Sequence, residues 1–129
     1  MKLLLPLLMM LTFSLTGCAM PAATPNTYRQ IPMQEAAQAM TQNENFILLD
    51  VRTPEEYAGG HIPGAINIPN ETIGMQDIVQ LPDKAQLIYV YCRSGNRSKQ
   101  AAEKLVKLGY TNIVEIGGVN AWPGELETE

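Results

Sequence analysis

Two runs of consecutive apolar residues dominate the pattern of this chain. Residues 46–51 form the first run, and residues 87–91 form the second, which leads into Cys92. Strands that are apolar at successive positions, rather than at alternate ones, are typical of a parallel sheet covered on both faces. Shorter runs predict three further strands, at residues 28–31, 65–68 and 112–116.

The segments between these runs carry the periodicity and the end signals of helices. Pro32 suits a first helical position, and residues 33–40 place their apolar side chains on one face. Thr53 and Pro54 fit the N-cap and first position of a second helix, with acids in its first turn. Further helices are predicted at residues 71–81 and 98–108, with a short helical piece within residues 117–122. Strands that alternate with helices predict an α/β fold with a parallel sheet.

The N-terminal stretch differs in pattern from the rest of the chain. Lys2 gives it a positive start, and the apolar run at residues 3–15 is too short for a comfortable membrane span but fits a secretory signal peptide. Residues 19–27 are rich in Pro, Ala, Thr and Asn, which is typical of a flexible tether. We therefore expect a leader at residues 1–17, a tether at residues 18–27 and one domain at residues 28–129.

The leader ends in Leu-Thr-Gly-Cys, at residues 15–18, which resembles the lipobox of bacterial lipoproteins. The resemblance implies cleavage after Gly17 and a lipid on Cys18, which would anchor the protein to a membrane. It also implies a place in the bacterial cell envelope, outside the cytoplasm and facing the periplasm. Because Ala19 follows the cysteine, the outer membrane is expected in a Gram-negative host. The alternatives are an ordinary signal peptide cut near Ala19 or Ala23, and an uncleaved anchor.

Charge and cysteine content argue against several classes of function. The formal net charge of −4 argues against a nucleic-acid partner. Of the two cysteines, Cys18 ends the leader, so Cys92 is expected to be the free thiol of the mature domain. A lone thiol excludes a C-x-x-C redox pair and a Cys-rich zinc site, and the single histidine, His61, disfavours a His-based metal site. We expect no metal and no organic cofactor.

Cys92 is the strongest candidate for chemistry because it is predicted to sit where a strand ends, a polar loop turns and a helix begins. Sites in open α/β sheets lie at the carboxyl ends of strands, and a helix N-terminus suits an anion. With Arg93 and Arg97 beside it, the thiol is expected to have a lowered pKa. Gly95 allows the loop to curl and to aim its N–H groups inward. The alternative is an inert, buried cysteine beside two solvated arginines.

Three other polar residues receive structural interpretations. Asp50 and Arg52 bracket the end of the first apolar run, and we interpret them as an ion pair that supports the fold by tying strand to loop. His61 can be read as a general base for Cys92, as in cysteine hydrolases. We prefer a role in fixing its own loop by hydrogen bonding, since nothing in the spacing places it near Cys92.

Three ordered segments together resemble the rhodanese-like family. Residues 49–57 with 60–69 are similar to its first signature, residues 91–98 to its active-site loop, and residues 117–122 to its closing segment. The resemblance covers nearly all of the expected mature chain. It implies a central parallel sheet of about five strands flanked by helices, with Cys92 as the nucleophile. It also implies an anion-binding loop made of Arg93, Ser94, Gly95, Asn96, Arg97 and Ser98.

The activity expected from this resemblance is sulfur transfer. A donor such as thiosulfate would leave a persulfide on Cys92, and a thiol or cyanide would accept the sulfur. The loop N–H groups would stabilise the negative charge, while Arg93 and Arg97 would hold the sulfonate end of the donor. Two alternatives stay open: a cysteine-dependent phosphatase or arsenate reductase, and a membrane-tethered binding module. By resemblance, the phosphatase loop has five residues between Cys and Arg, whereas four separate Cys92 from Arg97.

Overall fold

The structure is a computed structural model, and it describes residues 27–129. The predicted leader, Cys18 with its lipid, and the tether up to residue 26 lie outside the described residues and stay predictions. Within residues 27–129, no helix is long and apolar enough to cross a membrane.

Five parallel strands form one sheet in the order β1-β5-β4-β2-β3. All neighbouring pairs run parallel, which confirms the predicted sheet. The central strand β4 is buried at every position, as its unbroken apolar run predicts. The strands are β1 (Arg29–Gln30), β2 (Ile47–Asp50), β3 (Ile66–Asn67), β4 (Ile88–Cys92) and β5 (Ile113–Gly118).

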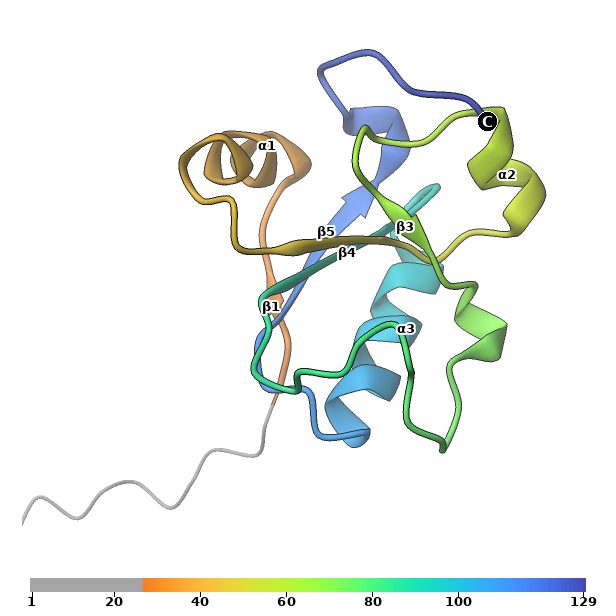
Figure 1. The fold of residues 1–129 in the computed structure, drawn as a ribbon. Helices are drawn as coiled ribbons and strands as arrows, with labels where there is room; N and C mark the ends of the chain where they lie inside the picture. The colour runs from red at the N-terminus through yellow and green to blue at the C-terminus, as the bar shows by residue number, and fades with distance from the viewer. Residues whose placement is uncertain (1–26) are drawn as a thin grey trace, which may run out of the picture.

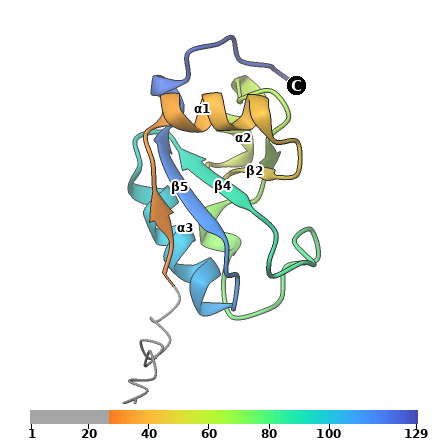
Figure 2. The same cartoon turned by 90° about the vertical axis from the view of Figure 1, so that its left-hand side faces the viewer.

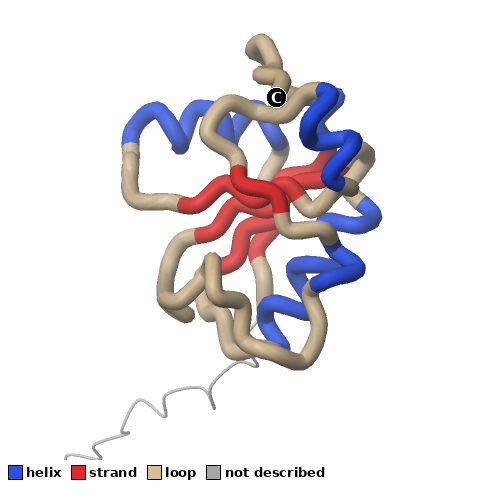
Figure 3. The backbone as a smooth tube through the Cα atoms, turned by 45° about the vertical axis from the view of Figure 1, so that its right-hand side comes forward, coloured by secondary structure: helices blue, strands red, loops and turns tan. Residues whose placement is uncertain are grey.

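Helices cover both faces of the sheet, as predicted, and this divides the core in two. On one face, Ala101, Ala102 and Leu105 of α3 (Asn96–Lys107) pack against Val90 and its neighbours. On the other face, residues of α1 (Met33–Gln42) pack against Leu48 of β2. Figure 1 shows α1 and α3 on opposite sides of the sheet, and Figure 3 shows the strands enclosed between helices. Trp122 packs against the α1 side.

The third helix, α2 (Pro54–Gly59), begins at the predicted N-cap. The Thr53 hydroxyl accepts a hydrogen bond from the Glu56 N–H at 3.2 Å, and the Glu56 carboxylate accepts one from the Thr53 N–H at 3.3 Å. This reciprocal pair is a capping box, which satisfies two donors at the helix start. The C-terminal segment lies beside α2 (Figure 1), where the Glu129 N–H donates to the carbonyl of Ala58 at 3.0 Å.

The prediction of a helix at residues 71–81 is wrong. Only one 3-10 turn forms there, η1 (Asn70–Thr72), and the chain then crosses in bends. Ile73 and Leu81 are both buried and pin the two ends of the segment to the core, while Met75 between them is 98% exposed. Gly74 disfavours a continuous helix by about 1 kcal/mol. The apolar residues of this segment are therefore anchors of a loop and not one face of a helix.

Smaller differences concern where elements begin and end. α3 begins at Asn96, two residues before the predicted start, because Gly95 takes a left-handed conformation and ends the loop. Pro32 lies just before α1 in an extended conformation and not in its first turn. β5 continues past residue 116 to Gly118, after which the predicted short helical piece forms as η2 (Val119–Ala121). Because β5 is longer, Gly117 and Gly118 lie at the carboxyl end of the sheet, beside Cys92.

Candidate active site

The site is built at the carboxyl ends of the central strands. Cys92 is the last residue of β4, and Asp50 is the last residue of the neighbouring β2. On the other side, the register between β4 and β5 shifts by one residue after Val90, so that Cys92 lies opposite Gly118. Such irregularities re-aim a strand end and are frequent beside active sites. Figure 2 shows β4 and β5 running side by side toward this end.

The Cys92 thiol is enclosed by its own loop. Its side chain is only 1% exposed, yet Sγ accepts a hydrogen bond from the Gly95 N–H at 3.0 Å and lies 3.3 Å from the Ser98 hydroxyl oxygen. Gly95 has φ of 107°, a conformation that favours glycine and that turns its N–H back toward the sulfur. The predicted curled loop with inward N–H groups is therefore present in the geometry.

These contacts favour the thiolate over the thiol. Burial alone raises the pKa of Cys92, but hydrogen bonds from the Ser98 side chain and from the N–H groups of Ser98, Gly95 and Ser94 outweigh it, so the pKa is lowered. Hydrogen bonding to the charged form is a sufficient cause for such a shift. The sequence pointed first to the two arginines; the structure assigns the larger part to the loop's own donors.

The loop rests directly on the backbone of Gly118. A Cβ atom at this position would lie 2.2 Å from the carbonyl oxygen of Arg93 and 2.8 Å from its carbonyl carbon. Both distances are shorter than atoms without a bond between them tolerate. Any side chain at residue 118 would therefore push the cysteine loop away from β5.

The two arginines of the loop occupy different environments. The guanidinium of Arg97 makes a bidentate ion pair with the Glu56 carboxylate, at 2.7 Å and 2.9 Å. This pair lowers the pKa of Glu56 to about 2 and raises that of Arg97. Arg93, in contrast, is exposed, and it lines a cleft of about 350 Å³ together with Arg52 and Asn120. Arg97 is thus engaged with α2, while Arg93 lies exposed on the wall of this cleft.

Asp50, Arg52 and His61 form the frame beside the site. Asp50 and Arg52 make a buried ion pair at 2.7 Å, and Arg52 also donates to the carbonyl of Gly60 at 2.6 Å, which ties the end of β2 to the following loop. His61 stacks on Tyr57 with ring centroids 3.8 Å apart, and its Nδ1 lies 2.8 Å from the Tyr57 carbonyl. Each of these contacts holds the loop after α2 in place.

Comparison with known proteins identifies the family. Residues 33–125 match the Rhodanese-like domain. The chain belongs to the rhodanese-like family. It is 42% identical over 71 residues to Thiosulfate sulfurtransferase PspE of Escherichia coli, covering 55% of this chain and 68% of that protein. It is 36% identical over 94 residues to a Sulfurtransferase of Allochromatium vinosum, covering 72% of this chain and 86% of that protein.

A solved structure and a longer relative complete the comparison. The rhodanese-like chain superposes on the crystal structure of a Rhodanese-like Domain Protein from Staphylococcus aureus with a TM-score of 0.67 and 34% identity, covering 78% of this chain and 98% of that one. It is also 39% identical over 94 residues to Adenylyltransferase and sulfurtransferase UBA4 of Meyerozyma guilliermondii, covering 67% of this chain. It spans only 22% of that protein's length.

One buried residue of this rhodanese-like site was missed by the sequence reasoning. Glu115 of β5 is 3% exposed, and its Oε1 accepts hydrogen bonds from the Ser98 hydroxyl at 2.6 Å and from the Gly117 N–H at 2.8 Å. The available signal was an acidic residue inside an apolar strand, just before the paired glycines. A buried polar group of this kind is more informative than an exposed one.

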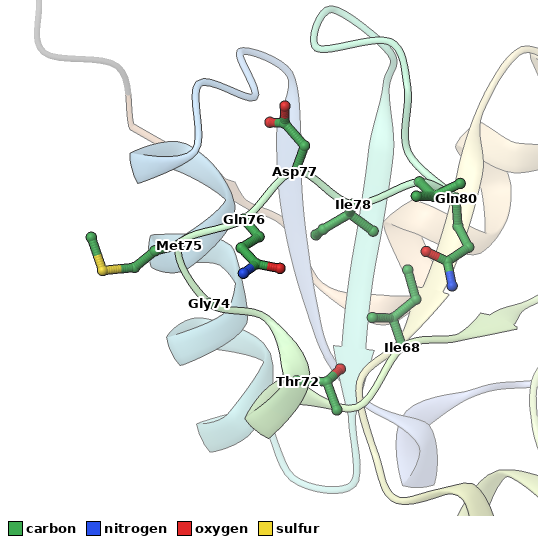
Figure 4. Close-up of a pocket in the computed structure, with 9 residues that line it drawn as sticks. Ile68, Thr72, Gly74, Met75, Gln76, Asp77, Ile78 and Gln80 are labelled. Atoms are coloured by element: carbon green, nitrogen blue, oxygen red, sulfur yellow. The ribbon is translucent and has the colours of Figure 1, made fainter.

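A second hollow of the rhodanese-like domain lies apart from the cysteine loop. It is formed between Ile68, Thr72 and the bends at residues 74–80, and none of its lining residues belongs to the loop. Figure 4 shows the Met75 side chain pointing away from the hollow, whereas Ile78 lies near Ile68, and Ile78 packs against the core. None of the residues that line this hollow is a cysteine, and Asp77 is the only charged one among them, so the hollow is not a candidate for thiol chemistry.

Proposed function

We propose that this protein is a sulfurtransferase that carries sulfane sulfur as a persulfide on Cys92. The observation that carries the proposal is the enclosure of Sγ by the N–H of Gly95 at 3.0 Å and the hydroxyl of Ser98 at 3.3 Å. The donors that converge on this sulfur are the N–H groups of Ser94, Gly95 and Ser98. Such donors stabilise negative charge without reorganising during the reaction. The similarity to thiosulfate sulfurtransferases supports thiosulfate, or a compound like it, as donor.

Sulfur transfer divides into two half-reactions. In the first, the Cys92 thiolate attacks the outer sulfur of the donor and forms a sulfur–sulfur bond to it. The donor's own sulfur–sulfur bond breaks with its electron pair, and sulfite leaves. In the second, a thiolate or cyanide attacks the outer sulfur of the persulfide, and the electron pair of that bond returns to Sγ. A covalent intermediate between two substrates predicts ping-pong kinetics.

The position of the arginines favours this reaction over phosphoryl or arsenate chemistry. In the proposed enzyme the exposed Arg93 meets the sulfonate end of the donor, since a guanidinium suits such oxyanions. A phosphatase needs an arginine free to close the loop over a tetrahedral oxyanion. Arg97 is instead held by both oxygens of Glu56.

The test is the intact mass of the purified protein, before and after thiosulfate and then after a thiol. We expect one added sulfur after thiosulfate, its loss after the thiol, and thiocyanate formation when cyanide is the acceptor. The Cys92→Ser variant keeps the size of the side chain but should show neither the added mass nor thiocyanate. If the wild-type protein gains no sulfur, or if it turns over p-nitrophenyl phosphate or arsenate instead, the proposal is overturned.

We further propose that this activity is held at the cell envelope by a lipid on Cys18. The support comes from the leader sequence alone: an apolar run of signal-peptide length that ends in Leu-Thr-Gly-Cys at residues 15–18. Stable attachment to a bilayer takes two acyl chains or more, which a lipidated N-terminal cysteine supplies. The donor and acceptor of sulfur would then be compounds available outside the cytoplasm.

A further inference from the structure

Glu115 is an unusual residue for the middle of a buried strand. Its neighbours in β5, Val114 and Ile116, are apolar and buried, and Glu115 itself is 3% exposed. None of the ion pairs found within residues 27–129 includes it. A carboxylate that is buried without a cation is costly unless hydrogen bonds or a proton compensate it. The hydrogen-bond partners of Glu115 therefore decide how its buried carboxyl group is stabilised.

Those contacts lead directly to the nucleophile through one hydroxyl group. The Ser98 Oγ lies 2.6 Å from Glu115 Oε1 and 3.3 Å from Cys92 Sγ. Ser98 itself is fully buried, and its hydroxyl carries a single proton. The 2.6 Å distance is that of a hydroxyl donating to a carboxylate. With that proton directed to Glu115, the thiol of Cys92 can only donate to Ser98, which completes a chain from Sγ through Oγ to Oε1.

The chain also leaves the loop's other hydrogen bonds intact. The Gly95 carbonyl lies 3.0 Å from Ser98 Oγ, but it also accepts from the Lys99 N–H at 3.3 Å and so does not require the hydroxyl proton. Glu115 Oε1 is fixed from its other side by the Gly117 N–H at 2.8 Å. The carboxylate is therefore held in position to receive a proton from Ser98.

We propose that Glu115 accepts the proton of the Cys92 thiol through Ser98, and so generates the thiolate that attacks the sulfur donor. The proton on Sγ passes to Ser98 Oγ as the hydroxyl proton passes to Glu115 Oε1. The products are a thiolate, an intact serine hydroxyl that now donates to it, and a neutral carboxylic acid; no other reactant is needed. This inference rests on the proposed function, and it makes Glu115 a positioning residue that acts through Ser98.

The surroundings of the pair contain few groups that could replace this exchange. Gln30 of β1 donates to the other carboxylate oxygen at 3.4 Å. The pKa of Tyr28, just before β1, is raised by burial and then by the carboxylates of Glu103 and Glu115. From α3, Arg97 interacts electrostatically with Cys92 but is bound to Glu56. In the proposed exchange, one negative charge is shared between Sγ and the carboxyl group. Because the exchange takes no proton from solvent, the share of thiolate that it forms should not depend on pH while the pair holds one proton.

The test compares full-length wild-type protein with Glu115→Gln, which keeps an oxygen to accept from Ser98 and Gly117 but cannot take up a proton. The readout is the rate at which hydrogen peroxide oxidises the Cys92 thiol, followed by intact mass, because this rate reports the thiolate. Each protein is measured beside the same protein carrying Cys92→Ala, so that any signal from elsewhere is subtracted. The assay needs no sulfur donor, so it can fail or succeed separately from the proposed function.

For the wild type, the oxidation rate should have a flat profile, changing by less than about twofold per pH unit over the range in which the pair holds one proton. For Glu115→Gln it should rise about tenfold per pH unit until the thiol itself ionises. The control Gln30→Ala, which disturbs only the other carboxylate oxygen, should keep the flat profile. Rates in the wild type that climb with pH as steeply as those of Glu115→Gln would overturn the proposal.

A second variant keeps the proposal falsifiable if Glu115→Gln does not fold, as judged by circular dichroism. Ser98→Ala interrupts the same chain while leaving the carboxylate in place, and it should also replace the flat profile by a steep one. A flat profile in folded Ser98→Ala would show that the proton does not travel through the hydroxyl, and would overturn the proposal. A purely structural role of either residue would change the melting temperature without changing the pH dependence of oxidation.

Discussion

Replacing Gly118 by alanine tests how closely the cysteine loop depends on β5. Gly118 has φ of −113° and ψ of 150°, which alanine adopts without strain, so the substitution acts through contact alone. The added Cβ would lie 2.2 Å from the Arg93 carbonyl oxygen, whereas carbon and oxygen atoms in contact are normally about 3.3 Å apart. The clash is with backbone, which cannot rotate away as the end of a flexible side chain does.

The magnitude follows from this distance. Relief of the clash requires the loop to move away from β5 by about 1 Å, and a displacement of that size can reduce an enzymatic rate by about 100-fold. This corresponds to about 2.7 kcal/mol of transition-state stabilisation. We therefore expect Gly118→Ala to lower kcat/KM for thiocyanate formation by about two orders of magnitude, through a misplaced Gly95 N–H rather than through loss of the nucleophile.

The assay is thiocyanate formation from thiosulfate and cyanide, with circular dichroism to confirm that the variant is folded. Gly74→Ala is the matched control, because a Cβ at Gly74 meets nothing within 4 Å and Gly74 lies outside the cysteine loop. It should retain wild-type activity. A Gly118→Ala enzyme that keeps more than about a third of the wild-type kcat/KM would refute the reasoning, since the loop would then tolerate the predicted displacement.

Three further predictions concern stability and location. The ion pair with Arg97 lowers the pKa of Glu56 from its ordinary 4.5 to about 2. The pair therefore stabilises the fold above pH 4.5, and this stabilisation is lost as the pH falls toward 2. The free energy of unfolding of Glu56→Gln should depend less on pH across that window. Tyr91→Phe removes the acceptor of the buried Ile62 N–H at 3.1 Å and should cost about 1–3 kcal/mol in urea unfolding, while an unchanged midpoint would contradict this. Cys18→Ala should abolish incorporation of labelled palmitate; label that persists would exclude lipidation there.

The missing helix at residues 71–81 shows a limit of prediction from the sequence pattern. The apolar residues of this segment and the proline that follows it suggested a helix. The pattern of polar and apolar residues does not distinguish single residues that anchor a loop from residues that form one face of a helix. Ile73 and Leu81 insert separately into the core, and Met75 and Val79 between them stay 98% and 89% exposed. Tertiary contacts at the two ends decided the local conformation over weak helical propensity.

The sequence by itself determined the strands, the parallel sheet, the capped start of α2 and the loop that follows Cys92. Each of these features depends on residues that are close together in the sequence, so composition and spacing predict it. Only the tertiary structure decided which groups surround the sulfur. Glu115 lies 23 positions after Cys92 and Glu56 lies 36 positions before it, so no local spacing links them to the loop. Parallel strands bring their carboxyl ends to one edge of the sheet, and that arrangement carries Ser98 to Glu115, Arg97 to Glu56 and the backbone of Gly118 against the cysteine loop.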